Sequence, residues 1–140
     1  MRAEVTAEQV NGAISRGVAF LEKMQRPDGR WSDHESEPGG ATALCAMALM
    51  NAGRSPDSPS VKKALAWLER LPDPERTYSS SLMIMAFAQA DPKRYALTIQ
   101  KLALALASRQ MRGDDKDTGG WTYRGPVGGS ADNSNAQFAI

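Results

Sequence analysis

Acidic side chains are concentrated in the glycine-rich segment around residues 113–120. Asp114, Asp115 and Asp117 lie there within four positions, and closely spaced carboxylates can hold a divalent cation. A cation-binding loop normally shows a fuller alternation of oxygen ligands than this segment has. These three residues are therefore weak metal candidates, and a solvated acidic loop is the better interpretation.

The chain has one histidine and one cysteine, and neither is placed for catalysis. His34 is surrounded by Asp33, Glu35 and Glu37, which could hold a metal or favour the protonated imidazole. A lone histidine in an acidic loop is more often just solvated. Cys45 has apolar neighbours and is interpreted as a small buried hydrophobe. The sequence contains no Ser/His/Asp set, phosphate-binding glycine loop or His-x-x-x-His spacing, so no cofactor is expected.

The overall charge of the 140 residues is nearly balanced. Lys and Arg total 17 and Asp and Glu total 16, a formal net charge of +1. This balance argues against nucleic-acid binding and against a polybasic membrane patch. Residues 1–10 lack the apolar core of a signal peptide, and no apolar run approaches the roughly 20 residues of a membrane span. We expect a cytoplasmic protein, with peripheral membrane association left open.

Apolar periodicity predicts an all-α chain in which one-sided and fully apolar helices alternate. Helices with one apolar side are predicted over about 6–24, 58–71 and 91–110, and fully apolar helices over about 41–52, 82–88 and from 134. Thr6 and Gln9 fit a capping box at the first helix, and Gly53 fits a C-cap. Asp91 and Pro92 are expected to begin the third one-sided helix.

The helices can be superposed as an internal repeat of three hairpins, with units over about 6–53, 58–90 and 91–140. An arrangement in two layers would cover the apolar surface of both kinds of helix, with one-sided helices outside and fully apolar helices inside. The third face of the inner helices then either packs as ordinary core or lines a concave apolar lumen. The candidate lumen residues are Leu44, Met47, Met50, Leu82, Met85, Phe87 and Phe138.

A loop motif follows the first helix. Its defined positions are Arg16, Gly17, Phe20, Gln25, Gly29 and Trp31. Glycine permits a tight turn, and the tryptophan offers a large buried surface and one N–H donor that the glutamine amide can meet. Gln110, Gly119 and Trp121 form a second copy. Eight residues separate its glutamine and glycine where the first copy has three, which argues against the same geometry there.

These motifs resemble the QW repeat of the terpenoid-cyclase and protein-prenyltransferase superfamily. Residues 134–140 are also similar to the opening of inner helices in squalene–hopene-cyclase-like proteins. The resemblance implies an α/α toroid, and the three hairpins, the last truncated, would make about half a ring. In the family, the glutamine and tryptophan staple neighbouring repeats.

The resemblance also frames the expected function. Cyclases of this family use an Asp-x-Asp-Asp motif, and prenyltransferases use a zinc bound by Asp, Cys and His; this segment has neither. One hypothesis is a toroid domain whose apolar concave face suits isoprenoid or triterpenoid chains. The alternative is a non-catalytic scaffold or binding module of a larger bacterial protein. Expected partners are an apolar isoprenoid or lipid ligand and the remainder of the toroid, from the same chain or a second one.

Overall fold

The structure is a computed structural model that describes residues 4–33, 37–113, 116–125 and 130–140. These residues form six α-helices and no strand, which confirms the all-α prediction. The helices are α1 (Ala7–Met24), α2 (Gly40–Asn51), α3 (Pro59–Leu68), α4 (Thr77–Ala90), α5 (Ala96–Ser108) and α6 (Asn133–Ala139).

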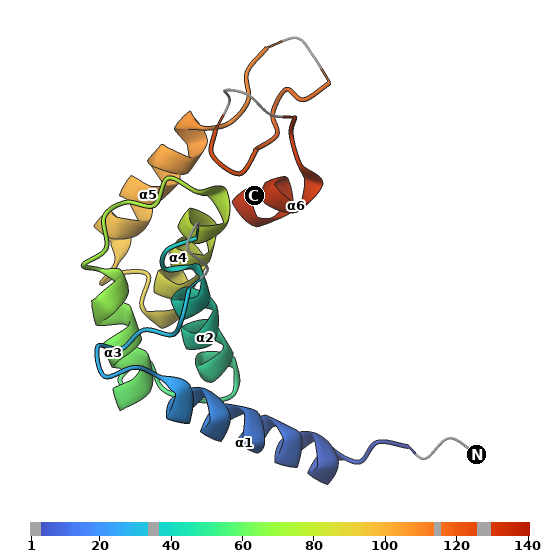
Figure 1. The fold of residues 1–140 in the computed structure, drawn as a ribbon, viewed down its shortest axis with the longest axis vertical. Helices are drawn as coiled ribbons and strands as arrows, with labels where there is room; N and C mark the ends of the chain where they lie inside the picture. The colour runs from blue at the N-terminus through green and yellow to red at the C-terminus, as the bar shows by residue number, and fades with distance from the viewer. Residues whose placement is uncertain (1–3, 34–36, 114–115, 126–129) are drawn as a thin grey trace.

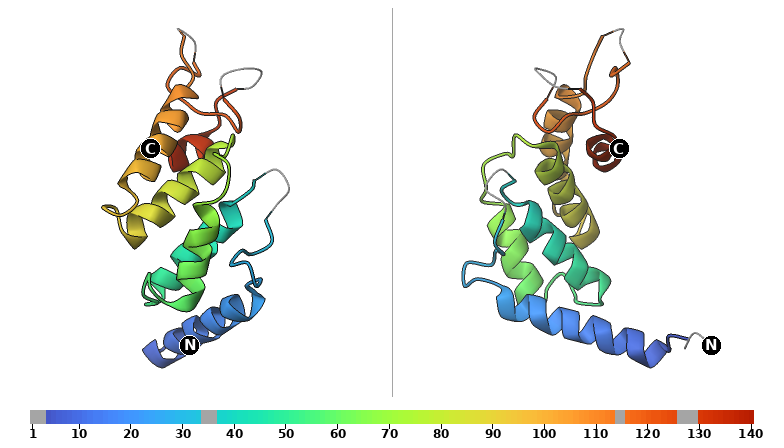
Figure 2. Two further views of the ribbon diagram at one scale, coloured as in Figure 1. Left: turned by 90° about the vertical axis from the view of Figure 1, so that its left-hand side faces the viewer. Right: turned by 45° about the vertical axis from the view of Figure 1, so that its right-hand side comes forward.

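The helices are arranged as a curved double layer (Figures 1 and 2). On the concave side α2, α4 and α6 follow one another, with α4 contacting both of the others. On the convex side α3 packs against α2 and α4, and α5 packs against α4. The first helix lies across one end, contacts α2 and extends beyond it (Figure 1). Because α2 and α4 have neighbours on several sides, their sequences are apolar around most of the helix.

The core lies between the two layers. Leu49, Val61, Leu68, Phe87 and Leu102 are all fully buried there and belong to one continuous cluster. Burial of side chains of this size contributes about 1.5–3 kcal/mol each. This double layer is therefore held by apolar contacts from every helix of the first two hairpins and from α5.

Local signals in the sequence define several helix ends. The Thr6 side chain accepts a hydrogen bond from the Gln9 N–H, and the Gln9 side chain accepts one from the Thr6 N–H, which confirms the capping box. Gly53 has a φ of 92°, as expected of a glycine that ends α2 in the left-handed region.

Two predicted helix starts were wrong. The fourth helix begins at Thr77 rather than near Leu82, because the Thr77 N–H and hydroxyl donate to the carbonyls of Tyr123 and Thr122. The fifth helix begins at Ala96, five residues after Asp91. The Asp91 carboxylate accepts from two backbone N–H groups that follow it, so residues 92–95 form a turn and not a helix.

Candidate functional site

The first loop motif is organised by Gln25 and Trp31. The Trp31 Nε1 donates to the carbonyl of Leu21 in the last turn of α1, at 2.9 Å. The Gln25 Nε2 donates to the carbonyl of Gly29 at 2.8 Å. Trp31 is buried, and its backbone N–H donates to the Thr42 hydroxyl at the start of α2. The indole therefore bonds a helix carbonyl and not the glutamine amide that the sequence suggested.

The second loop motif has the same arrangement. The Trp121 Nε1 donates to the carbonyl of Leu106, four residues before Gln110, at 2.9 Å. The Gln110 Nε2 donates to the carbonyl of Gly119 at 2.8 Å. The longer spacing argued against the same geometry, and that prediction was wrong: the Gly119 N–H donates to the Met111 carbonyl, which brings the two ends of the longer loop together.

The first loop is also fastened to α3. The Gln25 Nε2 donates a second hydrogen bond, to the carbonyl of Ser60, at 2.8 Å. Gly29 has a φ of 99°, and a Cβ there would lie 2.4 Å from the carbonyl oxygen of Lys63. Only glycine permits both this backbone conformation and this close approach. The loop thus joins the first outer helix to the second.

A surface ion pair reinforces the same junction. Arg54, after α2, donates from Nε and Nη2 to the Glu22 carboxylate of α1, at 2.8 and 3.0 Å. The Ser60 hydroxyl donates to the same carboxylate at 3.4 Å. The hydrogen bond from Arg54 and its positive charge lower the pKa of Glu22 below its ordinary value.

The helical residues of the motif lie outside this hydrogen-bonded loop. Arg16 and Phe20 are exposed on α1. Gly17 is exposed as well, and a Cβ at this position would meet nothing within 4 Å. The described residues give these three positions no role in the geometry of the loop.

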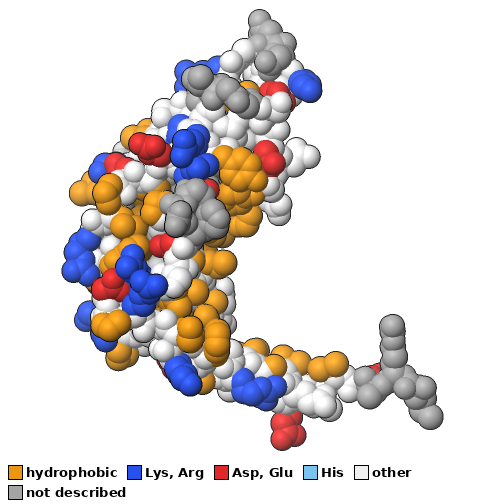
Figure 3. Space-filling model, in the orientation of Figure 1, with side chains coloured by type: hydrophobic (Ala, Val, Ile, Leu, Met, Phe, Trp, Pro, Cys, Tyr) orange, Lys and Arg blue, Asp and Glu red, His pale blue; other side chains and the backbone are white. Residues whose placement is uncertain are grey.

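The concave side of the molecule carries an apolar surface, which we call the open inner face (Figure 3). It consists of the outward rows of the inner helices: Leu44, Ala48 and Asn51 on α2, Tyr78, Leu82, Met85 and Gln89 on α4, and Phe138 on α6. A hydrogen bond from Gln89 to Asn51 joins the rows of α2 and α4. The rings of Tyr78 and Phe138, with centroids 5.2 Å apart, join α4 to α6.

The predicted lumen residues divide between this face and the core. Leu44, Met85 and Phe138 are 55%, 45% and 38% exposed. Met50 and Leu82 are partly buried.

Met47 and Phe87 are buried in the core, so the prediction that they line the lumen was wrong. Both belong to the apolar core cluster, and Phe87 packs against the Tyr95 ring at a centroid distance of 4.7 Å. A helix that is apolar all round gives no sequence signal for which side faces the outer layer, so this division could not be read from periodicity.

An aromatic cluster at the α6 end of the face was not anticipated. Tyr78 contacts Tyr123 as well as Phe138, with ring centroids 5.7 Å apart, and its hydroxyl donates to the Ser134 hydroxyl. Tyr78 precedes the segment that was predicted to be helical, so its place on the inner row could not be recognised. Tyr78 and Phe138 are far apart in the sequence, and no local pattern indicates that their rings are in contact.

The helices that form the open inner face, α2, α4 and α6, carry no carboxylate, imidazole or basic side chain. Cys45 on α2 is partly buried, and burial, with a smaller contribution from the Asp33 charge, raises the pKa of its thiol. A protonated thiol of this kind is a poor nucleophile. This surface is suited to apolar contact and not to proton transfer.

The apolar side of α1, at one end of the molecule, is more exposed than the apolar side of α3 in the middle. Ile14 of α1 is 46% exposed, whereas Val61, its equivalent 47 positions later on α3, is fully buried. The reason is that α3 packs between two inner helices, whereas α1 contacts only α2 among the helix pairs with substantial contact. The apolar surface therefore continues from the open inner face onto α1, as Figure 3 shows.

The weak metal candidates gain no support. No group of three or more His, Cys, Asp or Glu side chains that could hold a metal is present among the residues the structure describes. Asp117 is described, whereas Asp114, Asp115 and His34 lie outside the described residues. Within the same part of the chain, none of the helices combines the length and apolar character required to cross a membrane.

Comparison with known proteins adds no relative: no protein-family model, curated protein or solved structure matches this chain.

Proposed function

We propose that this chain is a helical-repeat domain of the α/α-toroid type, about half a ring, and that its open inner face binds an apolar isoprenoid or triterpenoid chain. The observation that carries the proposal is the exposure of Leu44, Met85 and Phe138 on three successive inner helices. Contiguous exposed apolar surface on a water-soluble domain commonly marks an interaction site.

The composition of the face supports an apolar ligand. Its polar groups are neutral and hydrogen-bonded: Asn51 accepts from Gln89, and the Tyr78 hydroxyl donates to Ser134. They therefore impose a smaller desolvation cost than charged groups would. Methionine is flexible and polarisable, and Met85 can adapt to the methyl branches of an isoprenoid. The resemblance of the two loop motifs to the QW repeat favours this class of ligand over an unbranched lipid.

The proposal is one of binding, without a catalytic step in this segment. The cyclases that this chain resembles protonate their substrate with an aspartic acid, and the inner helices carry no carboxylic acid. The exposed row of α1 around Ile14 provides a surface on which further hairpins or a second chain would pack. A scaffold role without an apolar ligand is the competing function, and it predicts no affinity for isoprenoids.

Calorimetric titration of the purified chain with farnesol tests the proposal, with dodecanol as an unbranched comparison. We expect farnesol to bind more tightly than dodecanol. Met85→Glu should weaken farnesol binding about tenfold or more, because the new carboxylate loses water when the ligand covers it. Leu104→Glu is the matched control, since Leu104 is 65% exposed on α5, away from the inner layer.

Absence of farnesol binding would overturn the proposal and favour the scaffold role. Equal losses in the Met85 and Leu104 variants would also contradict it, because the site would then lie elsewhere. Light scattering supplies a second measurement. A compact monomer that shows no bound apolar ligand would argue against an apolar surface that requires cover.

A further inference from the structure

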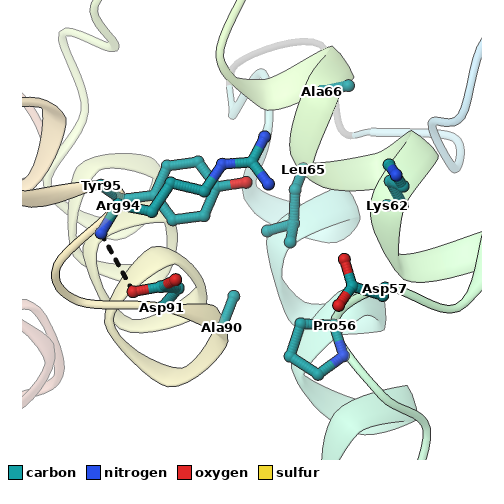
Figure 4. Close-up of a pocket in the computed structure, with 9 residues that line it drawn as sticks. All are labelled: Pro56, Asp57, Lys62, Leu65, Ala66, Ala90, Asp91, Arg94 and Tyr95. Carbon is teal, nitrogen blue, oxygen red and sulfur yellow. Dashed lines mark hydrogen bonds between the residues drawn. The ribbon is translucent and has the colours of Figure 1, made fainter.

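A cavity of about 180 Å³ lies away from the open inner face, between α3 and the α4–α5 turn (Figure 4). Its floor is apolar and includes Leu65 of α3 and Ala90 at the end of α4. Its polar lining comes from three segments: Asp57 before α3, Lys62 on α3, and Arg94 with Tyr95 after α4.

The Tyr95 hydroxyl has no hydrogen-bond partner among the described residues, although Tyr95 is only 4% exposed. The hydroxyl oxygen itself is not fully buried, so it opens onto the cavity and can donate to a ligand there. Figure 4 shows it directed towards α3, beside the Arg94 guanidinium, whose Cζ lies 5.1 Å from the centre of the Tyr95 ring. Burial raises the pKa of Tyr95, with smaller contributions from Glu69 and other nearby carboxylates, so the hydroxyl stays protonated and available as a donor.

Charged groups of both signs lie at the rim of this cavity. Arg94, Lys62 and Asp57 are exposed, and none of them forms an ion pair with the described residues, so all three are available to a ligand. Asp91 differs, because its Oδ1 accepts from the backbone N–H groups of Lys93 and Arg94, both at 3.0 Å. In Figure 4 Lys62 and Asp57 lie on one side of the cavity, with Arg94 and Tyr95 on the other.

The corresponding end of the first hairpin is closed. There Arg54, which follows α2 as Arg94 follows α4, makes two hydrogen bonds to Glu22 of α1. Glu69 of α3 is the repeat equivalent of Glu22, 47 positions later, but Arg94 lies over Tyr95 instead of pairing with it. The second hairpin therefore has an open cavity and unpaired charges where the first has an ion pair.

We infer that this cavity binds a small zwitterionic amino acid with an aliphatic side chain. The Arg94 guanidinium and the Tyr95 hydroxyl donate to its carboxylate on one side of the cavity, and Asp57 accepts from its ammonium group on the other. The aliphatic side chain covers Leu65 and Ala90 on the floor. A ligand with both charges complements Arg94 on one side and Asp57 on the other, whereas a ligand with a single charge complements one of them and is repelled by the other.

Titration of the full chain with L-leucine tests this inference. Two comparison ligands each lack one charged group: 4-methylpentanoate has no ammonium, and isoamylamine has no carboxylate. We expect leucine to bind more tightly than either. Arg94→Gln and Tyr95→Phe should each weaken leucine binding, the former about tenfold or more because it removes a charge-assisted bond. Lys93→Gln is the control, since Lys93 is exposed next to Arg94 but does not line the cavity.

Asp57→Asn provides the sharpest result. It should weaken leucine binding and leave 4-methylpentanoate binding unchanged or stronger. Circular dichroism verifies that each variant is folded, and Tyr95→Phe keeps the ring that packs on Phe87. The inference is overturned if folded wild-type protein does not bind leucine at millimolar concentration, if Arg94→Gln binds it normally, or if 4-methylpentanoate binds as tightly as leucine. None of these outcomes bears on the open inner face, because farnesol binding is measured separately.

Discussion

The loops that follow α1 and α5 make the same hydrogen bonds over different lengths of chain. In each, a tryptophan N–H donates to a carbonyl of the preceding helix, and a glutamine donates to the carbonyl of a glycine with positive φ. The loops differ in their outer contacts. Gln25 also bonds Ser60 on α3, whereas among the described residues the Gln110 side chain bonds only Gly119.

The difference separates two roles that the motif combines. The bonds from tryptophan and glutamine shape the loop on its own helix and survive an insertion of five residues. The contacts to Ser60 and Lys63 fasten one hairpin to the next and occur where the loop is short. Closing the loop is thus a local property of the motif, whereas joining the loop to another helix depends on what packs outside it.

Replacing Gly29 and Gly119 by alanine should give the largest difference in stability between the two loops. Gly29→Ala places a Cβ 2.4 Å from the Lys63 carbonyl oxygen and keeps a φ of 99°, so we expect a loss of about 3 kcal/mol of unfolding free energy. Gly119→Ala has the same conformational penalty at a φ of 85° but meets open space, so about 1 kcal/mol is expected. Urea unfolding of both variants measures the difference, and equal losses would show that contact with α3 contributes nothing.

Replacing the two glutamines should also destabilise the first loop more than the second, but by a smaller difference. Gln25→Ala removes two partly buried hydrogen bonds and should cost about 1.5 kcal/mol. Gln110→Ala removes one exposed bond and should cost about 0.5 kcal/mol. Thermal or urea unfolding is sufficient for this comparison. A larger loss at Gln110 than at Gln25 would contradict the distinction between stapling and local closure.

The smallest expected effect is on how the free energy of unfolding depends on pH, through the ion pair of Glu22 and Arg54. Because the pKa of Glu22 is lower in the folded chain than its ordinary value, its ion pair with Arg54 contributes stability above that ordinary pKa. This contribution is lost as the pH falls below the ordinary pKa of a glutamate and through the lower pKa of the folded state. Arg54→Ala should flatten the dependence of unfolding free energy on pH in that range. Lys62→Ala, an exposed change without an ion pair, is the control, and an unaltered slope in Arg54→Ala would contradict the assignment.

The parts of the structure that could be predicted are those encoded locally. The capping box at Thr6 and the glycine at Gly53 depend on residues within a few positions of each other, and both are present as expected. The positions of Gln25 and Trp31 were also identifiable, because the complete motif lies within one short segment.

The parts that could not be predicted depend on contacts between distant residues. Thr77 begins α4 through a bond to Thr122, 45 positions away, and no local pattern encodes that partner. Arg109 donates to the Pro74 carbonyl and to the Ser80 hydroxyl, which joins α5 to the segment before α4. The cavity beside Tyr95 likewise requires α3 and the α4–α5 turn to be placed in space before its unpaired groups can be recognised.

The base of the second loop has a practical consequence for protein engineering. Met111 donates to the carbonyl of Gly120 and accepts from the N–H of Gly119, at 2.9 and 2.8 Å, so the chain is clamped on both sides of the intervening segment. With the ends clamped, each doubling of a flexible loop costs only about 0.6 kcal/mol of closure entropy. Residues 112–118 are therefore the preferred place to graft an epitope, a fluorescent reporter or a protease site while leaving the helical layers intact.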